Sequence, residues 1–97
     1  MKLAWSNLAR QELQALQRYS VDNWGAVVAR RYLEDVRDAA KSAAEHPERT
    51  RALRGQFRIQ RVRSHYLILD VDHAAQRVTV ARILHGAMDI ERHLPEA

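Results

Sequence analysis

The spacing of apolar residues changes near Gly55, and this change restricts the fold more than any other feature of the sequence. Before Gly55, apolar residues recur every three or four positions over two long stretches, which is typical of amphipathic helices. After Gly55 they alternate with polar residues or form short continuous runs, as in half-buried and fully buried strands. A chain of 97 residues has room for one domain. The sequence therefore predicts a single α+β domain over residues 1–97.

Two helices are expected before this change, joined by a tight turn at residues 21–25. Ser6 or Asn7 can cap the first helix, because either side chain can accept a hydrogen bond from an orphan backbone amide. His46-Pro47 ends the second helix, since a residue before proline avoids the helical backbone conformation. Two apolar stripes and a tight turn predict an antiparallel helical hairpin. The expected stripes are Ala9, Leu13, Leu16 and Ser20, widened by Leu8 and Tyr19, and then Val28, Tyr32, Val36, Ala39 and Ala43, beside Leu33, Ala40 and Ala44.

Four strands are expected, one at the N-terminus and three after Gly55. Short loops between the last three predict an antiparallel meander, with the N-terminal strand at a sheet edge and the helical hairpin on one face. The strand over residues 66–71 is apolar on both faces, so we place it centrally. The expected strands are residues 2–5, a strand from Phe57 to a turn at Arg63-Ser64, residues 66–71 and residues 77–85. A short C-terminal helix with Ile90 and Leu94 on one side follows, and Pro95 ends it.

Arginines concentrate in the middle of the chain. The net charge is +4, and fourteen of the sixteen basic residues are arginine. Residues 1–48 carry seven basic and seven acidic side chains, whereas residues 49–69 carry six arginines and no acid. Guanidinium groups suit bidentate contacts with carboxylate or phosphate, so this segment should attract a polyanion or an acidic protein. A solvated basic strand face would explain the same pattern.

Several classes of site are missing from the sequence. The chain has no cysteine, which excludes disulfides and thiolate metal sites. The five histidines are scattered, so we expect no zinc site and no other metal. No glycine-rich loop precedes a helix, and we expect no cofactor. No apolar run approaches the ~18 residues that span a membrane. We therefore expect a cytoplasmic protein without membrane contact.

The end of the last strand is the strongest candidate for chemistry. RNA can be cut by its own 2′-hydroxyl when a general acid, a general base and cations surround the phosphate. His85 could act as acid or base, and Arg82 with Arg58 or Arg61 could hold the phosphate. The simpler interpretation, which we prefer, is that His85 closes the strand with a hydrogen bond before Gly86 turns the chain.

Trp24 lies in the expected helix–helix turn, beside Gly25. A large aromatic side chain is difficult to bury at such a turn. It can serve as a lid on the core of the hairpin or as an exposed anchor for a partner, and the sequence slightly favours the lid.

The tail resembles a known family. The segment from Arg82 to Arg92, RILHGAMDIER, is similar to the strand-end pattern of the ParE branch of the RelE/ParE toxin superfamily, an aliphatic-Leu-His-Gly sequence followed by an Asp-aliphatic pair. Further similarities are Trp5-Ser6 followed by Ala9 and Leu13, then Ala29, the alanine-rich end of the second helix, and Pro47. The chain departs from the family at Glu48-Arg49-Thr50, where a glycine is common, and at Leu69-Asp70, where an aromatic residue is common.

The resemblance implies the toxin component of a type II toxin–antitoxin system, of the kind associated with plasmid stabilisation. A ParD-like antitoxin would neutralise it by folding an acidic, largely disordered arm onto it, forming a hetero-oligomer. The toxin would meet DNA only indirectly, through the antitoxin's DNA-binding domain. The expected antitoxin contacts are Arg54, Arg58, Arg61 and Arg82, and the expected target contacts are Trp24 and Arg92.

The resemblance also bears on the toxic activity. ParE members are associated with inhibition of DNA gyrase, whereas RelE members are ribosome-dependent mRNA endonucleases that use basic residues and a late tyrosine or histidine. This chain has no tyrosine after Tyr66, so it is closer to ParE. We expect a gyrase-binding growth inhibitor without catalytic residues. The alternatives are an RNA endonuclease that uses Arg82 and His85, and a non-toxic protein-interaction module.

Overall fold

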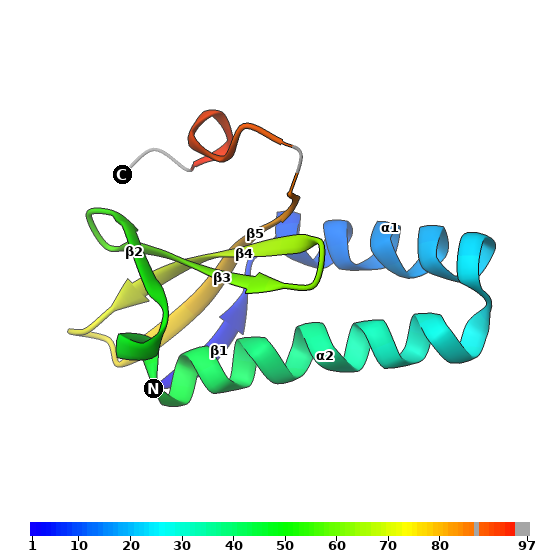
Figure 1. Cartoon of the computed structure of the whole chain (residues 1–97). Coiled ribbons are helices and arrows are strands. Elements are labelled where there is room, and N and C mark those ends of the chain that lie inside the picture. The colour runs from blue at the N-terminus through cyan, green and yellow to red at the C-terminus, as the bar shows by residue number, and fades with distance from the viewer. Residues whose placement is uncertain (87, 95–97) are drawn as a thin grey trace.

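The computed structural model describes residues 1–86 and 88–94, and Figure 1 shows a helical hairpin packed against a mixed sheet. This arrangement confirms the expected α+β class. The expected end of the last helix at Pro95 lies outside the described residues. The elements are β1 (Lys2–Trp5), α1 (Asn7–Trp24), α2 (Ala26–Glu45), the 3₁₀ helix η1 (Pro47–Arg49), β2 (Arg51–Arg54), β3 (Phe57–Val62), β4 (His65–Asp72), β5 (Arg77–His85) and the 3₁₀ helix η2 (Ile90–His93).

The sheet has the strand order β1-β5-β4-β3-β2. Strands β3, β4 and β5 form the expected antiparallel meander, with β4 at its centre. Strand β1 joins one edge and runs parallel to β5. The opposite edge strand, β2, was not predicted. It has two arginines and a register shift between Ala52 and Arg54, so it lacks the apolar alternation by which strands are recognised.

The first helix begins at the predicted cap. The Ser6 hydroxyl oxygen accepts a hydrogen bond from the Ala9 amide at 3.0 Å and donates one to the Ala81 carbonyl at 2.8 Å. The expected turn at residues 21–25 is shorter than predicted, because α1 continues through Trp24 and α2 starts at Ala26. Gly25 alone makes the turn, with φ of 87°, a backbone conformation that L side chains rarely adopt.

The helical hairpin covers one face of the sheet, as expected (Figure 1). Its buried residues, among them Leu16, Tyr32 and Val36, pack on apolar side chains of β4 and β5. Three predicted stripe residues are exposed instead: Leu8 (46%), Tyr19 (57%) and Val28 (48%). Tyr19 of α1 and Val28 of α2 are within a few residues of the turn at Gly25, and this end of the hairpin extends beyond the sheet (Figure 1). Leu8 lines a cleft beside the C-terminal segment.

The opposite face of the sheet carries a smaller apolar cluster of Phe57, Ile59, Ile68 and Leu84. Ile90 and Leu94 of the C-terminal segment pack against this cluster, so the segment crosses the face that the hairpin leaves open (Figure 1). The expected short C-terminal helix is a 3₁₀ helix, η2. Among the described helices, none is long and apolar enough to cross a membrane.

Candidate functional site

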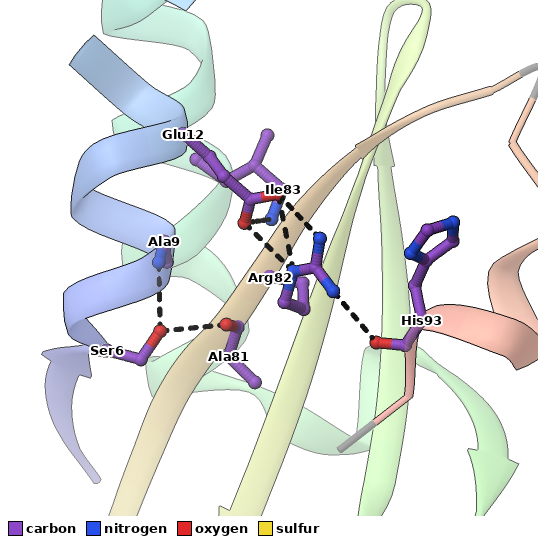
Figure 2. Close-up of polar contacts among 7 residues, drawn as sticks. All are labelled: Ser6, Ala9, Glu12, Ala81, Arg82, Ile83 and His93. Atoms are coloured by element: carbon purple, nitrogen blue, oxygen red, sulfur yellow. Dashed lines mark hydrogen bonds and ion pairs between the residues drawn. The ribbon is translucent and has the colours of Figure 1, made fainter. Parts of the chain in front are cut away.

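Glu12 completes the edge of β5 at the point where β1 ends. The last β1–β5 residue pair is Trp5 with Val80, so the outer edge of β5 beyond this pair has no strand beside it. Glu12 reaches this edge from α1, and its Oε1 accepts the Ile83 amide at 3.0 Å (Figure 2). A buried backbone amide without a partner costs about 1–3 kcal/mol. The carboxylate therefore replaces the missing strand.

The same carboxylate holds Arg82. The Arg82 Nη2 atom lies 3.0 Å from Glu12 Oε2, and Nε lies 3.2 and 3.3 Å from the two carboxylate oxygens. The side chains are only 18% and 20% exposed. Arg82 Nη1 also donates to the His93 carbonyl at 3.3 Å, which ties the C-terminal segment to α1 and β5 (Figure 2). The charge of Arg82 is thus already paired within the chain.

Sequence reasoning missed Glu12, although a signal was present. Glu12 lies three residues after Ala9 and four before Leu16, which places it on the buried stripe of α1. A carboxylate on such a stripe needs a partner, because an unpaired buried charge is costly. That partner could have been sought among the arginines.

Arg82 and His85 leave β5 on opposite faces of the strand. Side chains alternate between the faces of a strand, so Arg82 shares a face with Leu84 and His85 shares the other with Ile83. Leu84 belongs to the apolar cluster under the C-terminal segment, and Ile83 belongs to the cluster under the hairpin. The two side chains therefore leave β5 on opposite faces, and the guanidinium of Arg82 is engaged by Glu12 rather than by His85.

His85 instead joins a series of rings that runs from β5 to the end of the hairpin. It lies opposite His65 in the β4–β5 register, with ring centroids 5.3 Å apart. The hydroxyl of Tyr32 is hydrogen-bonded to His65 Nδ1 at 2.6 Å. The Tyr32 ring lies 5.6 Å from Trp24, which in turn meets Tyr19 edge-on at 5.8 Å. Partial burial, and then the neighbouring His85, lower the pKa of His65.

A cleft of 380 Å³ follows these rings on the hairpin side of the sheet. Its lining combines six apolar or aromatic side chains with four polar ones, Glu12, Ser64, His65 and His85, and the apolar majority suits a partner's apolar side chain. The residues that line it are Glu12, Ala15, Leu16, Tyr19, Trp24, Ser64, His65, Ile83, His85 and Met88.

Gly86, the glycine of the tail signature, lies at a close backbone approach that favours glycine. Its amide donates to the Ser64 carbonyl at 2.8 Å. A Cβ at this position would lie 3.1 Å from that carbonyl oxygen and 3.4 Å from the Tyr66 ring. The predicted strand exit at His85-Gly86 is therefore a point where β5 leaves the sheet under a steric constraint.

The arginines of the sheet differ in their availability. Arg58 is turned inward, and its guanidinium donates to the Thr50 hydroxyl at 2.7 Å and to the Thr50 carbonyl, which fastens η1 to β3. Arg54 is exposed at the end of β2. Arg61 is exposed too, and lies 5.8 Å above the Tyr66 ring. Arg61 also lines a cleft of 310 Å³ together with Arg49, Arg51, Ile59, Gln60 and Tyr66.

The two expected target contacts lie apart. Trp24, at the end of α1, is 43% exposed. It is therefore both a packing partner of Tyr32 and an accessible side chain, which joins the two interpretations that the sequence allowed. Arg92 is on η2, where its exposed guanidinium pairs with Asp89 at 3.4 Å. Within residues 1–86 and 88–94, no three potential metal ligands converge.

Comparison with known proteins extends these observations. A family model described as the ParE toxin of type II toxin–antitoxin systems, parDE, matches residues 3–90. The chain belongs to the ParE toxin family. Toxin ParE1 of Mycobacterium tuberculosis, strain H37Rv, is 32% identical over 92 residues, which cover 92% of this chain and 93% of that protein. The matched residues include the His85-Gly86 signature and nearly the whole fold.

Solved structures share the ParE-family fold at lower identity. The chromosomal ParDE toxin–antitoxin system of P. aeruginosa contains a chain with a TM-score of 0.75 and 17% identity, covering 88% of this chain and 95% of that one. The RelBE2 toxin–antitoxin complex of Mycobacterium tuberculosis matches with a TM-score of 0.66 and 20% identity, covering 87% and 95%. The YoeB/ParE toxin of Agrobacterium tumefaciens matches with 0.65 and 20%, covering 88% and 98%.

Proposed function

We propose that this ParE-family toxin inhibits growth by binding DNA gyrase and that a ParD-like antitoxin with an acidic arm neutralises it. The observation that carries the proposal concerns Arg82 and His85, the two side chains on which the RNA endonuclease alternative depends. Arg82 is paired with Glu12, and His85 is on the opposite face of the sheet. This arrangement favours an inhibitor that acts by binding. The family membership supports the toxin role.

The proposed antitoxin contacts are the exposed arginines of the β2–β3 edge. Arg54 and Arg61 are accessible, whereas Arg63 of the same segment is paired with Asp35 of α2 at 2.5 Å. An acidic arm could therefore bind here through charge-assisted hydrogen bonds. Arg58 and Arg82 contribute by holding η1 and the C-terminal segment in place, since both guanidinium groups already have partners.

Gyrase supercoiling assays test the toxic activity. Purified toxin is titrated into a supercoiling reaction, with and without a two-fold excess of the antitoxin. We expect inhibition by the toxin and recovery with the antitoxin. Undiminished supercoiling at saturating toxin would refute the gyrase proposal. Discrete mRNA cuts in a translating extract that disappear with His85→Ala would replace it with the endonuclease alternative.

Charge reversal tests the antitoxin surface. The double variant Arg54→Glu, Arg61→Glu should bind the antitoxin at least about tenfold more weakly, because like charges now face each other. The matched control is the double variant Arg10→Glu, Arg37→Glu, since both are exposed arginines of the helical hairpin, outside the β2–β3 edge. Equal losses in the double variant and the control would show only a general charge effect.

A further inference from the structure

The exposed apolar side chains of the chain are concentrated at one place. Seven large apolar side chains are exposed among the described residues, and five of them lie within residues 19–28. These residues form the end of the hairpin, which extends beyond the sheet and can be approached from several sides (Figure 1). We call them the tip patch: Tyr19 (57% exposed), Val21 (41%), Trp24 (43%), Val27 (72%) and Val28 (48%). Val21 lines a separate cleft with Ala29 and Leu33, whereas Tyr19 and Trp24 line the cleft beside the rings, so the tip patch extends over more than one side of the hairpin end. Exposed apolar side chains concentrated in this way mark an interaction surface.

The tip patch continues into the cleft of 380 Å³ described above, which we call the aromatic cleft. Tyr19 and Trp24 belong to the patch and also line this cleft, together with the buried residues Leu16 and Ile83. Rigid aromatic residues beside a pocket are the usual centres of binding energy in protein interfaces. Such a surface can receive an apolar side chain in the cleft while the patch covers the area around it.

The charges around the patch indicate its partner. Residues 18–31 contain three arginines, at positions 18, 30 and 31, and one acid, Asp22, which gives a net charge of 3 − 1 = +2. A second copy of the chain would bring these arginines against each other, which disfavours self-association. An acidic protein surface would be attracted instead.

We propose that the tip patch and the aromatic cleft are the surface with which this toxin docks onto gyrase, through an acidic region of gyrase that inserts an apolar anchor into the cleft. The inference rests on the proposed function and adds the contact surface to it. It also separates this surface from Arg54 of β2, because β2 and the hairpin tip lie at opposite ends of the molecule (Figure 1).

Two substitutions at Val27 test both the location and the charge of the partner. Val27 is the most exposed residue of the patch and lies in the first turn of α2, where an aspartate interacts favourably with the helix dipole, so Val27→Asp should fold. Binding of the full-length variants to purified gyrase and to the antitoxin is measured by titration. Val27→Asp should weaken gyrase binding at least about tenfold, whereas Val27→Lys should stay within about threefold of wild type. Antitoxin affinity should change little in either variant.

Four outcomes would overturn the inference. Wild-type toxin that fails to bind gyrase removes the proposed function and this surface together. Wild-type binding that Val27→Asp leaves unchanged removes the surface alone. Loss of antitoxin affinity in Val27→Asp with intact gyrase binding assigns the patch to the antitoxin. A wild-type dimer in sedimentation that Val27→Asp dissociates, again with intact gyrase binding, assigns it to a second copy of the chain.

Discussion

At the scale of single residues, Glu12 has two structural roles. It accepts the amide of Ile83, for which the sheet supplies no strand, and it neutralises Arg82. Arg82 in turn donates to the carbonyl of His93. One carboxylate on α1 thus closes the edge of β5 and, through Arg82, contributes to holding the C-terminal segment.

Removal of the Glu12 carboxylate should destabilise the folded protein. We expect Glu12→Ala to lower the free energy of unfolding by about 1–3 kcal/mol, because the Ile83 amide and the Arg82 guanidinium lose their acceptor. Urea denaturation measures the change. Glu12→Gln keeps one acceptor oxygen and should lose less. In the double variant Glu12→Ala, Arg82→Ala, the two losses should not add, since the residues interact directly. Additive losses would mean that the pair is not a unit.

His65 should make stability depend on pH. Its pKa is lowered in the folded protein, so the folded chain binds a proton less readily than the unfolded chain does. Above pH 6.5, the ordinary pKa that the unfolded chain retains, His65 is neutral in both states and does not affect stability. As the pH falls below 6.5, the unfolded chain gains the proton first, so the free energy of unfolding decreases. Between pH 7.5 and pH 5.0, the wild-type protein should lose more stability than His65→Gln in urea denaturation. Equal losses would show that other groups cause the acid sensitivity.

At the scale of elements, the pattern of apolar residues predicted those helices and strands whose positions depend on burial. The central position of β4 and the hairpin followed from it, because buried side chains leave a periodic record in the sequence. Strand β2 left no such record, since an edge strand needs backbone pairing more than burial. Tyr19 and Val28 were predicted as core because periodicity does not tell how far a helix extends beyond its sheet. The pairing of Glu12 with Arg82, seventy positions apart, depends on the assembled fold.

The strand exit at Gly86 provides a test at this scale. A methyl group there would approach the Ser64 carbonyl oxygen to 3.1 Å, so β5 or the β3–β4 turn must shift. We expect Gly86→Ala to lower the free energy of unfolding by about 1–2 kcal/mol. Amide exchange should show faster opening at Gly86, whose amide is bonded to that carbonyl. Wild-type stability and exchange would mean that the neighbouring backbone yields at no cost.

At the scale of the whole molecule, the sheet separates two apolar cores with different roles. The hairpin closes the larger core, and the C-terminal segment lies over the smaller one. Part of the proposed antitoxin surface is also separated from the tip patch, since β2, which ends in Arg54, and the tip of the hairpin lie at opposite ends of the molecule (Figure 1).

The two cores can be distinguished by matched substitutions. Leu67 and Leu84 are both fully buried, Leu67 under the hairpin and Leu84 under the C-terminal segment. Each change to alanine should cost about 2–5 kcal/mol of unfolding free energy. Only Leu84→Ala should also speed amide exchange within residues 90–94, because Ile90 and Leu94 pack against the cluster that contains Leu84. If Leu67→Ala released this segment equally, the sheet would not insulate one core from the other.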